Sequence, residues 1–326
     1  MYELQLMNEL SDPSYPTPPY KDPLDKRIVS IIRKNNKAQE GSLNIVGIPF
    51  DGATLGRRGS RLAPNYIRDS LRFDSNFNVE TGDLLLEVKM NDLGDMVFSD
   101  EEIDSIHGDI QRLVSLNIKE RSLLILLGGD NSISLPAILA CANRYTNVGL
   151  IVIDSHFDLR GKIRNRPTSG SSYGLAIEAL GSRISNRVVE LGIHGFVNSY
   201  KYMRKAQRIG VTFFTAEDVR KYGATTSARR AYQIAAEGAD CVYLSLDLDS
   251  VDISQVSGVS APSPGGLCAQ DVFDIIYFIA SRPKVKCADI VETSPPLDPT
   301  GKTPVVAATS LLYMAAGFGL RGFLSR

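Results

Sequence analysis

Cysteine is scarce in this sequence, and the few cysteines present lie far apart. Cys141, Cys241, Cys268 and Cys287 form no Cys-x-x-Cys pair, which argues against a thiol-based zinc site or a dithiol redox couple. Reduced, buried thiols are instead typical of a cytosolic protein. The N-terminus also lacks a basic start followed by an apolar block, so it does not resemble a signal peptide. We therefore expect a cytoplasmic location.

Excess charge and long apolar runs are also missing. Lys and Arg total 36 against 37 for Asp and Glu, so the net charge of -1 gives no field that would attract nucleic acid or an anionic membrane. The longest weakly polar stretch, residues 305–320, is interrupted by Thr309, Ser310 and two glycines. It falls short of the roughly 20 residues of a membrane helix. We expect no nucleic-acid or membrane partner.

The composition that is present, 43% hydrophobic and 22% charged, is that of a globular protein able to bury its own core. Five prolines lie within the first 42 residues, where neither helix nor sheet can run for long. We interpret residues 1–42 as a Pro-rich arm that lies on the body or on a neighbouring subunit. Residues 43–326 show no repeat or low-complexity linker, which indicates one domain.

Short β-branched runs alternate with longer helical patterns after this arm. The predicted strands are residues 43–50, 122–127, 148–154, 187–193, 211–214, 241–247 and 285–291. The predicted helices are residues 100–119, 134–144, 173–180, 199–208, 227–238, 269–281 and 304–317. Nearly all the strands are apolar on both faces, as in parallel sheets covered by helices. The pattern predicts one three-layer α/β/α domain with a mostly parallel central sheet.

Metal-type ligands follow two of the predicted strands. In extended chain, side chains two residues apart lie on the same side, so Asp154, His156 and Asp158 share one side after the strand of residues 148–154. By the same period, Asp247 and Asp249 share one side at the end of the strand of residues 241–247. Alone, D-x-H-x-D is weak evidence, because Asp often ends strands as a helix cap. Together, so many like charges repel unless a cation lies among them, which indicates bound metal.

Two further strand ends carry polar groups. Gly128, Gly129, Asp130 and Asn131 lead from a strand into a helix, which by itself is only a tight turn with a polar cap. Glu292 follows the last predicted strand and offers one more carboxylate. The alternative for Glu292 is an ordinary surface acid.

The order G-G-D, D-x-H-x-D, S-x-D-x-D-x-x-D and V-E-x-x-P resembles the arginase/agmatinase/formimidoylglutamase (ureohydrolase) family over about residues 43–320. Residues 47–52 and 59–64 are similar to the first strand and loop of that family. The resemblance implies an arginase-like fold, a pair of manganese ions and hydrolysis of a guanidinium or formimino C–N bond. It also suggests a homo-oligomer, either a trimer or a hexamer.

The resemblance assigns the metal ligands residue by residue. Asp154 and Asp247 match the carboxylates that bridge both metals, Asp158 completes one site, and His156 with Asp249 completes the other. Carboxylates with one imidazole suit manganese. Two metals about 3.5–4 Å apart can produce hydroxide at neutral pH. We therefore expect a metal-bridging hydroxide to attack the amidine carbon.

Two departures from the family pattern concern histidine. Asn131 stands where the family has a metal-binding His, and an amide oxygen is a neutral and weaker ligand, so occupancy of that metal site is in question. The second His that arginases use to move protons has no counterpart in residues 160–178. His107 is interpreted as a surface or packed residue. His194 is the spare imidazole at the catalytic edge, with proton relay or substrate contact as one role and a structural role as the other.

The substrate-side segments favour an acidic amidine. Residues 257–266 resemble the G-V-S-A-P form of formimidoylglutamases, and Arg160 with the loop Ser169, Gly170 and Ser171 resembles their substrate segments. Glu292 matches the family carboxylate that holds the cationic amidine. Arg160 would hold a carboxylate of formimidoylglutamate. The prediction is manganese-dependent hydrolysis of formimidoylglutamate to glutamate and formamide.

Three alternatives stay open. An agmatinase or another guanidino hydrolase would release urea, and residues 47–52 resemble that branch equally well. A metal-deficient, non-catalytic family member would follow from Asn131, although unpaired clustered carboxylates would then cost stability. A zinc deacetylase on a similar fold rests on analogy alone.

Overall fold

A ten-stranded sheet forms the centre of the protein in this computed structural model, which describes residues 10–17, 22–98 and 102–324. The strand order is β1-β4-β3-β5-β10-β9-β6-β7-β8, and β2 pairs with β4. Within this described part all pairs are parallel except β1 with β4. The strands are β1 Leu10–Ser11, β2 Arg33–Lys34, β3 Leu43–Gly47, β4 Met90–Met96, β5 Leu123–Leu127, β6 Val148–Ile153, β7 Val188–Ile193, β8 Thr212–Thr215, β9 Cys241–Asp247 and β10 Val285–Val291.

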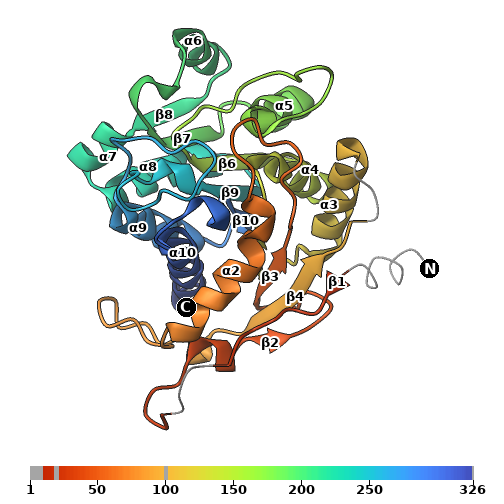
Figure 1. Cartoon of the computed structure of the whole chain (residues 1–326). Helices are drawn as coiled ribbons and strands as arrows, with labels where there is room; N and C mark the ends of the chain where they lie inside the picture. The colour runs from red at the N-terminus through yellow and green to blue at the C-terminus, as the bar shows by residue number, and fades with distance from the viewer. Residues whose placement is uncertain (1–9, 18–21, 99–101, 325–326) are drawn as a thin grey trace.

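Helices cover both faces of the sheet (Figure 1). On one face α3, α4, α5 and α6 contribute to a buried core, and on the other α2, α7, α8, α9 and α10 contribute to a second core. The helices are α2 Ala63–Ser70, α3 Ile103–Asn117, α4 Ser134–Arg144, α5 Ser172–Leu180, α6 Tyr200–Arg208, α7 Ala216–Tyr222, α8 Ala224–Ala236, α9 Ala269–Ala280, α10 Lys302–Gly319 and α11 Arg321–Leu324.

Strand β6 shows why the sequence folds into three layers. Its six residues are all buried. Leu150 and Val152 belong to the core with α3 to α5, whereas Ile151 and Ile153 belong to the core with α8 to α10. A strand that is apolar at every position can bury both faces only between two layers of helices. The predicted three-layer, mostly parallel fold is confirmed.

Strand β4 and helix α2 were not predicted from the apolar pattern, because their buried contact is made by paired charged side chains. Arg68 on α2 is fully buried and donates to Asp92 of β4 through Nε at 2.7 Å and a terminal nitrogen at 2.9 Å. It also contacts Asp95 at 2.5 Å. An apolar pattern cannot reveal such a strand. Removing one partner of a buried ion pair typically costs about 3–5 kcal/mol, so this pair ties α2 to the sheet.

The described parts of the N-terminal arm lie on the body. β1 and β2 both pair with β4, and the Tyr15 hydroxyl donates to Asp92. Pro18 and Pro19 of the Pro-rich arm and residues 100–101 of a predicted helix lie outside the described residues. The first predicted strand ends at Gly47 instead of Phe50, two residues before Pro49, which has no N–H to donate.

The weakly polar stretch 305–320 lies mostly within α10, in agreement with the helix predicted over residues 304–317, and its inward side is buried against the core. Among the described residues, no helix is both long enough and apolar enough to cross a membrane.

Glu190 is an unusual member of the core. It lies in the middle of β7 with no exposed surface, and neither carboxylate oxygen has a hydrogen-bond partner among the described residues. Burial, together with the nearby charges of Asp154 and Asp158, raises the pKa of Glu190 well above its usual value. Burial therefore favours the neutral, protonated form of Glu190 in the folded protein.

We expect Glu190→Gln to gain stability relative to the parent protein as pH rises. Below the unfolded-state pKa of 4.5, Glu190 is protonated in both the folded and the unfolded chain, so pH does not change its contribution to stability. Above that pH, Glu190 ionises in the unfolded chain but is disfavoured from ionising in the folded one. The free energy of unfolding of the parent therefore falls by up to about 1.4 kcal/mol per pH unit. Urea unfolding between about pH 5 and pH 7 measures the trend. The exposed Glu178→Gln is the control, and a pH-independent difference between Glu190→Gln and parent would contradict the neutral acid.

Candidate metal centre

Four aspartates meet where the adjacent parallel strands β6 and β9 end. Asp154 directly follows β6 and accepts the N–H of His156 at 2.6 Å, while Asp247 ends β9 and accepts the N–H of Asp249 at 2.9 Å. Each of these carboxylates thus caps a tight turn. The turns bring His156 and Asp249 to the same edge of the sheet.

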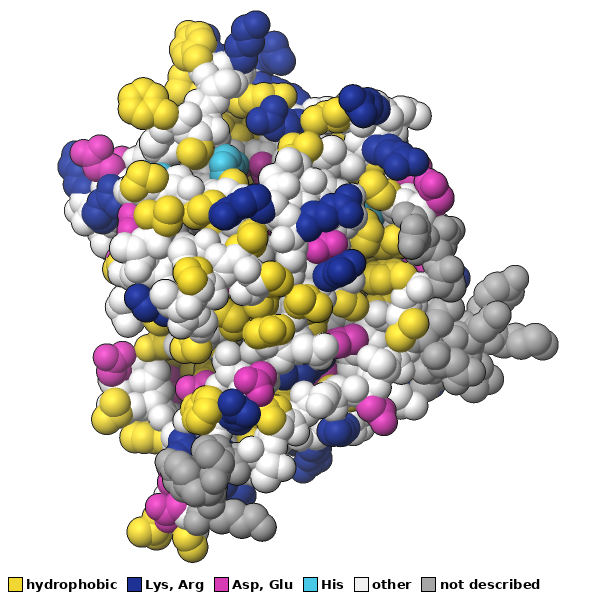
Figure 2. Space-filling view, in the orientation of Figure 1, with side chains coloured by type: hydrophobic (Ala, Val, Ile, Leu, Met, Phe, Trp, Pro, Cys, Tyr) yellow, Lys and Arg dark blue, Asp and Glu magenta, His cyan; other side chains and the backbone are white. Residues whose placement is uncertain are grey.

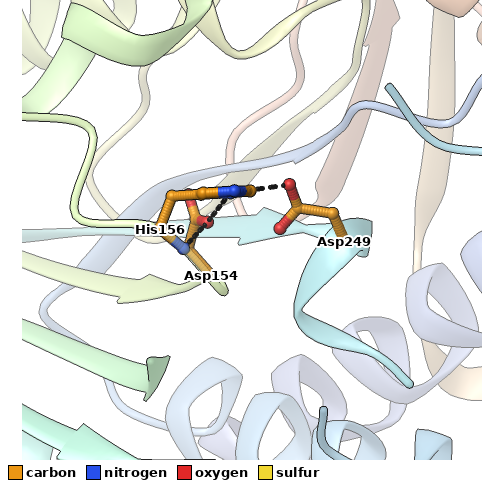
Figure 3. Close-up of side chains that lie close together, drawn as sticks. All are labelled: Asp154, His156 and Asp249. Atoms are coloured by element: carbon orange, nitrogen blue, oxygen red, sulfur yellow. Dashed lines mark hydrogen bonds and ion pairs between the residues drawn. The ribbon is translucent and has the colours of Figure 1, made fainter. Parts of the chain in front are cut away.

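The ligand atoms form two groups that share one residue. Asp154, His156 and Asp249 form one group, and Asp154, Asp158 and Asp247 form the other, with one ligand atom of each residue within 4.8 Å of the others in its group. Figure 3 shows the His156 ring between Asp154 and Asp249, with Nδ1 at 3.0 Å from Asp249 Oδ2. The arrangement is suited to two cations with a common carboxylate.

The charges in this cluster shift one another's pKa values. Burial, with neighbouring carboxylates, raises the pKa of Asp154 and Asp247 well above the usual value, and burial raises the pKa of Asp158 to about 7. Burial alone would lower the pKa of His156, but Asp249 and Asp154 raise it to about 12. The protein alone therefore neutralises these acids with protons and an imidazolium, a task that divalent cations would take over.

Asn131 lies at this cluster. Its backbone N–H donates to Glu292 Oε1 at 2.8 Å, and its carbonyl accepts the Ser172 hydroxyl at 2.7 Å. Its side-chain nitrogen donates to Asp158 at 2.6 Å and approaches Asp154 at 3.4 Å. The amide nitrogen, and not the oxygen, therefore faces the carboxylates.

Glu292 is buried, with 3% of its surface exposed, so the surface-acid alternative is wrong. Its φ of 63° lies in the left-handed region, as does the φ of 45° at Asp158, a conformation that costs energy for these residues and is often found at functional sites. Oε1 accepts from Asn131, whereas Oε2 is buried without a hydrogen-bond partner in the described structure. One carboxylate oxygen is thus available to a ligand.

Both ring nitrogens of His194 are engaged. Nδ1 donates to the Gly192 carbonyl at 2.7 Å, because a carbonyl only accepts, and Nε2 lies within hydrogen-bond distance of the Ser263 hydroxyl oxygen, at 2.7 Å. His194 therefore ties β7 to the loop of residues 257–266. The proposed catalytic role of His194 stays a prediction.

Arg160 lies beside the loop of residues 168–171. Its N–H donates to the Gly170 carbonyl at 3.0 Å, and its guanidinium lies 5.3 Å from the centre of the Tyr202 ring. A Cβ on Gly170 would approach Arg160 Cδ to 3.0 Å, so glycine leaves room for this side chain. The charge of Arg160 also acts to lower the pKa of Asp158, against the larger effect of burial. Arg160 is therefore near the metal-ligand cluster.

The two predicted serines of this loop have protein partners. Ser169 Oγ accepts from the Leu55 N–H at 3.2 Å, which joins the loop to residues 51–60. The Ser171 hydroxyl both accepts from the Thr168 N–H and donates to its carbonyl, each at 2.8 Å. Ser171 is fully buried, so its hydroxyl shapes the loop and its substrate role stays a prediction.

Sequence reasoning did not assign a role to Asn198, Ser134 or Asp289. Asn198 donates to the Ser155 carbonyl at 2.6 Å and accepts from the Phe157 N–H at 3.1 Å, which fixes the backbone on both sides of His156. Asn198 follows a predicted strand at the same sheet edge, so the strand-end rule could have indicated it. Ser134 begins helix α4 and contacts Asn131, and Asp289 lies within strand β10 and contacts Ser134. Neither residue follows the end of a strand, so the strand-end rule could not have indicated them.

We expect Asp154→Asn to weaken metal binding more than Asp158→Asn does. Asp154 belongs to both ligand groups, whereas Asp158 belongs to one. Asp154→Asn should therefore weaken both metal sites and Asp158→Asn only one. Changing a residue that merely supports a ligand lowers metal affinity roughly 10- to 100-fold, so the loss of a ligand itself should be larger. Elemental analysis after dialysis against limiting Mn²⁺ gives the metal content per chain. Asp69→Asn on the exposed side of α2 is the control. Equal losses for the two ligand variants would contradict the shared position of Asp154.

Known proteins share this fold and sequence. Residues 42–317 match the Arginase family. A formimidoylglutamase of Halalkalibacterium halodurans is 31% identical over 275 residues, covering 84% of this chain and 86% of the relative. Agmatinases are among the other relatives.

Solved structures agree with the sequence comparison. The crystal structure of formimidoylglutamase from Bacillus subtilis matches with a TM-score of 0.86 at 26% identity, over 98% of this chain and 99% of that one. A structure of Trypanosoma cruzi formiminoglutamase with Mn²⁺ matches with a TM-score of 0.82 at 26% identity, over 91% of this chain and 99% of that one.

Proposed function

The chain belongs to the arginase family, and from this premise we propose that it is a manganese-dependent formimidoylglutamase, which hydrolyses formimidoylglutamate to glutamate and formamide. The observation that carries the proposal is the pair of ligand groups sharing Asp154, next to a buried carboxylate with one free oxygen, Glu292 Oε2. The similarity to formimidoylglutamases over most of the chain supports the choice of substrate.

Manganese fits the donor set, which combines carboxylate oxygens with one imidazole. The residues that would hold it are Asn131, Asp154, His156, Asp158, Asp247 and Asp249. Two such cations, when bound, lower the pKa of a water molecule and stabilise the charge that develops at the attacked carbon. Without them, the clustered acids would depend on protonation, on His156 and on the hydrogen bonds that neighbouring N–H groups donate to them.

Glu292 would orient the cationic formimino group. Its Oε1 is held by the Asn131 N–H, so the carboxylate cannot rotate freely, and its Oε2 is left for the substrate. A charge-assisted hydrogen bond from a formimino nitrogen to Oε2 is stronger than a neutral one. The planar amidine would thereby be fixed against the metal-ligand cluster, which is the positioning that hydrolysis requires.

A basic rim would recognise the acidic end of the substrate. Figure 2 shows Lys and Arg side chains gathered over the upper part of the face of the molecule that is turned toward the viewer. Arg160 has no ion-pair partner within the described ranges and lies near Asp158. The two carboxylates of formimidoylglutamate suit such a rim, whereas agmatine ends in a cation. A guanidino acid would also suit Arg160, so the assay has to separate these substrates.

The experiment is product analysis of the Mn²⁺-loaded protein with formimidoylglutamate, guanidinobutyrate, agmatine and arginine, each supplied separately. We expect formamide from formimidoylglutamate, and a loss of about 100-fold or more in kcat/KM for Glu292→Gln with unchanged metal content. Urea as the main product would move the proposal to a guanidino substrate. Absence of every product from a fully metal-loaded protein would overturn the proposed function.

Arg160→Met should weaken binding of formimidoylglutamate with little change in kcat. The variant keeps the length and packing of the side chain but removes a charged donor, which is worth about 1.5–3 kcal/mol, or roughly 10- to 100-fold in KM. Steady-state kinetics separates KM from kcat. Arg166→Met, on the exposed loop next to Glu102, is the matched control. A drop in kcat without a change in KM would contradict a substrate-binding role.

We also propose a cytoplasmic homo-oligomer, either a trimer or a hexamer. The four cysteines are free and three of them are buried, which supports a reducing compartment. The fully exposed Phe196 and the largely exposed Tyr200 are apolar surface that a partner subunit could cover. Light scattering after size-exclusion chromatography decides the mass, and a monomer at micromolar concentration would contradict the assembly.

A further inference from the structure

The Ser134 hydroxyl lies between two acceptors at the base of the metal centre. It is 3.1 Å from Asn131 Oδ1 and 2.6 Å from Asp289 Oδ2, and all three residues are buried. A serine hydroxyl has a single proton but can accept through its lone pairs. Ser134 therefore donates fully to one of these two neighbours.

Asp289 is the stronger competitor for this proton. Its carboxylate accepts from the hydroxyls of Ser134, Tyr243 and Ser245 at 2.5–2.6 Å. Burial raises the pKa of Asp289 to about 6 against the effect of these hydrogen bonds, and three converging hydroxyl donors are the surroundings that a carboxylate anion requires. Because a bond to an anion is shorter and stronger than a bond to an amide oxygen, the Ser134 proton points to Asp289. Ser134 then presents only lone pairs to Asn131.

The other end of the Asn131 amide has the opposite requirement. Nδ2 lies 2.6 Å from Asp158 and 3.4 Å from Asp154, which suits bare carboxylates. A cation held by the same carboxylates would repel these N–H groups and attract an oxygen. Hydrogen bonds to Glu292 and Ser172 hold the Asn131 backbone in place. The amide can therefore exchange its ends by turning about the Cβ–Cγ bond.

We propose that Ser134 is a positioning residue that turns the Asn131 amide oxygen toward the cation, by accepting a hydrogen bond from Asn131 Nδ2 while donating its own proton to Asp289. This inference rests on the proposed metal-dependent function. It explains how a neutral side chain serves as a ligand. An amide has one oxygen and must be oriented, and the Ser134–Asp289 pair favours the orientation that binds metal.

The test is a double-mutant cycle on the full-length protein, with Mn²⁺ affinity measured by calorimetry and Mn²⁺ electron paramagnetic resonance. Ser134→Ala should lower the affinity of the weaker site by about 10-fold or more. In the Asn131→Asp background both distal atoms are oxygens, so no amide needs orienting, and Ser134→Ala should change affinity less than about 2-fold. A purely structural role of Ser134 would give the same loss in both backgrounds and would overturn the proposal.

Two further variants keep the result readable. Ser245→Ala also removes a hydroxyl that donates to Asp289, but Ser245 makes no hydrogen bond to Asn131 in the described structure, so a loss equal to that of Ser134→Ala would also contradict the proposal. Ser134→Thr keeps the hydroxyl and should retain Mn²⁺ affinity, and it replaces Ser134→Ala as the test if that variant folds poorly. If folded Ser134→Thr loses as much affinity as Ser134→Ala, the proposal is contradicted.

Formamide production by the parent protein is measured in parallel. A parent that binds Mn²⁺ but makes no formamide would overturn the proposed function and leave the positioning result standing. A parent that binds no Mn²⁺ would overturn both.

Discussion

Repulsion among buried carboxylates is the constraint on which the rest of this structure depends. Four aspartates and Glu292 meet at the ends of β6, β9 and β10, where burial and mutual repulsion disfavour ionisation of most of them. Such a cluster is tolerable only where the backbone is rigid and donates to it. The parallel sheet supplies the rigidity, and the N–H groups of His156, Asp249 and Asn131 supply the donors.

The loops around this cluster are joined to one another in the same way. Asp130 accepts the N–H of Ala53, which holds residues 51–60 over the site, and Arg57 donates to the carbonyl of Val259 in the next loop. His194 anchors that same loop through Ser263. These hydrogen bonds join the loops above the site to its buried base, and in the proposed function the exposed cations on the loops select the substrate.

Asn131 shows how a local departure is accommodated by its surroundings. Where a histidine would coordinate through a ring nitrogen, this chain has an amide with one oxygen and one nitrogen end. The amide sits between carboxylates on one side and the Ser134–Asp289 pair on the other. In the proposed metal site, this hydrogen-bond network determines which end of the Asn131 amide faces the cation.

Much of the fold and the ligand cluster was determined by the sequence alone. Apolar runs predicted seven of the strands, because periodicity is a local property of the chain. The predicted metal-type ligands do meet at the strand ends, but turns and not extended chain bring them together, since Asp154 accepts the His156 N–H and Asp249 lies in a 3-10 helix. Only the tertiary structure decided the partners of buried polar groups. Arg68 pairs with Asp92, Ser134 donates to Asp289, which lies 155 positions away, and the Glu190 carboxyl has no hydrogen-bond partner among the residues that the structure describes. Such pairings depend on which distant segments the packing brings together, and no local pattern records that.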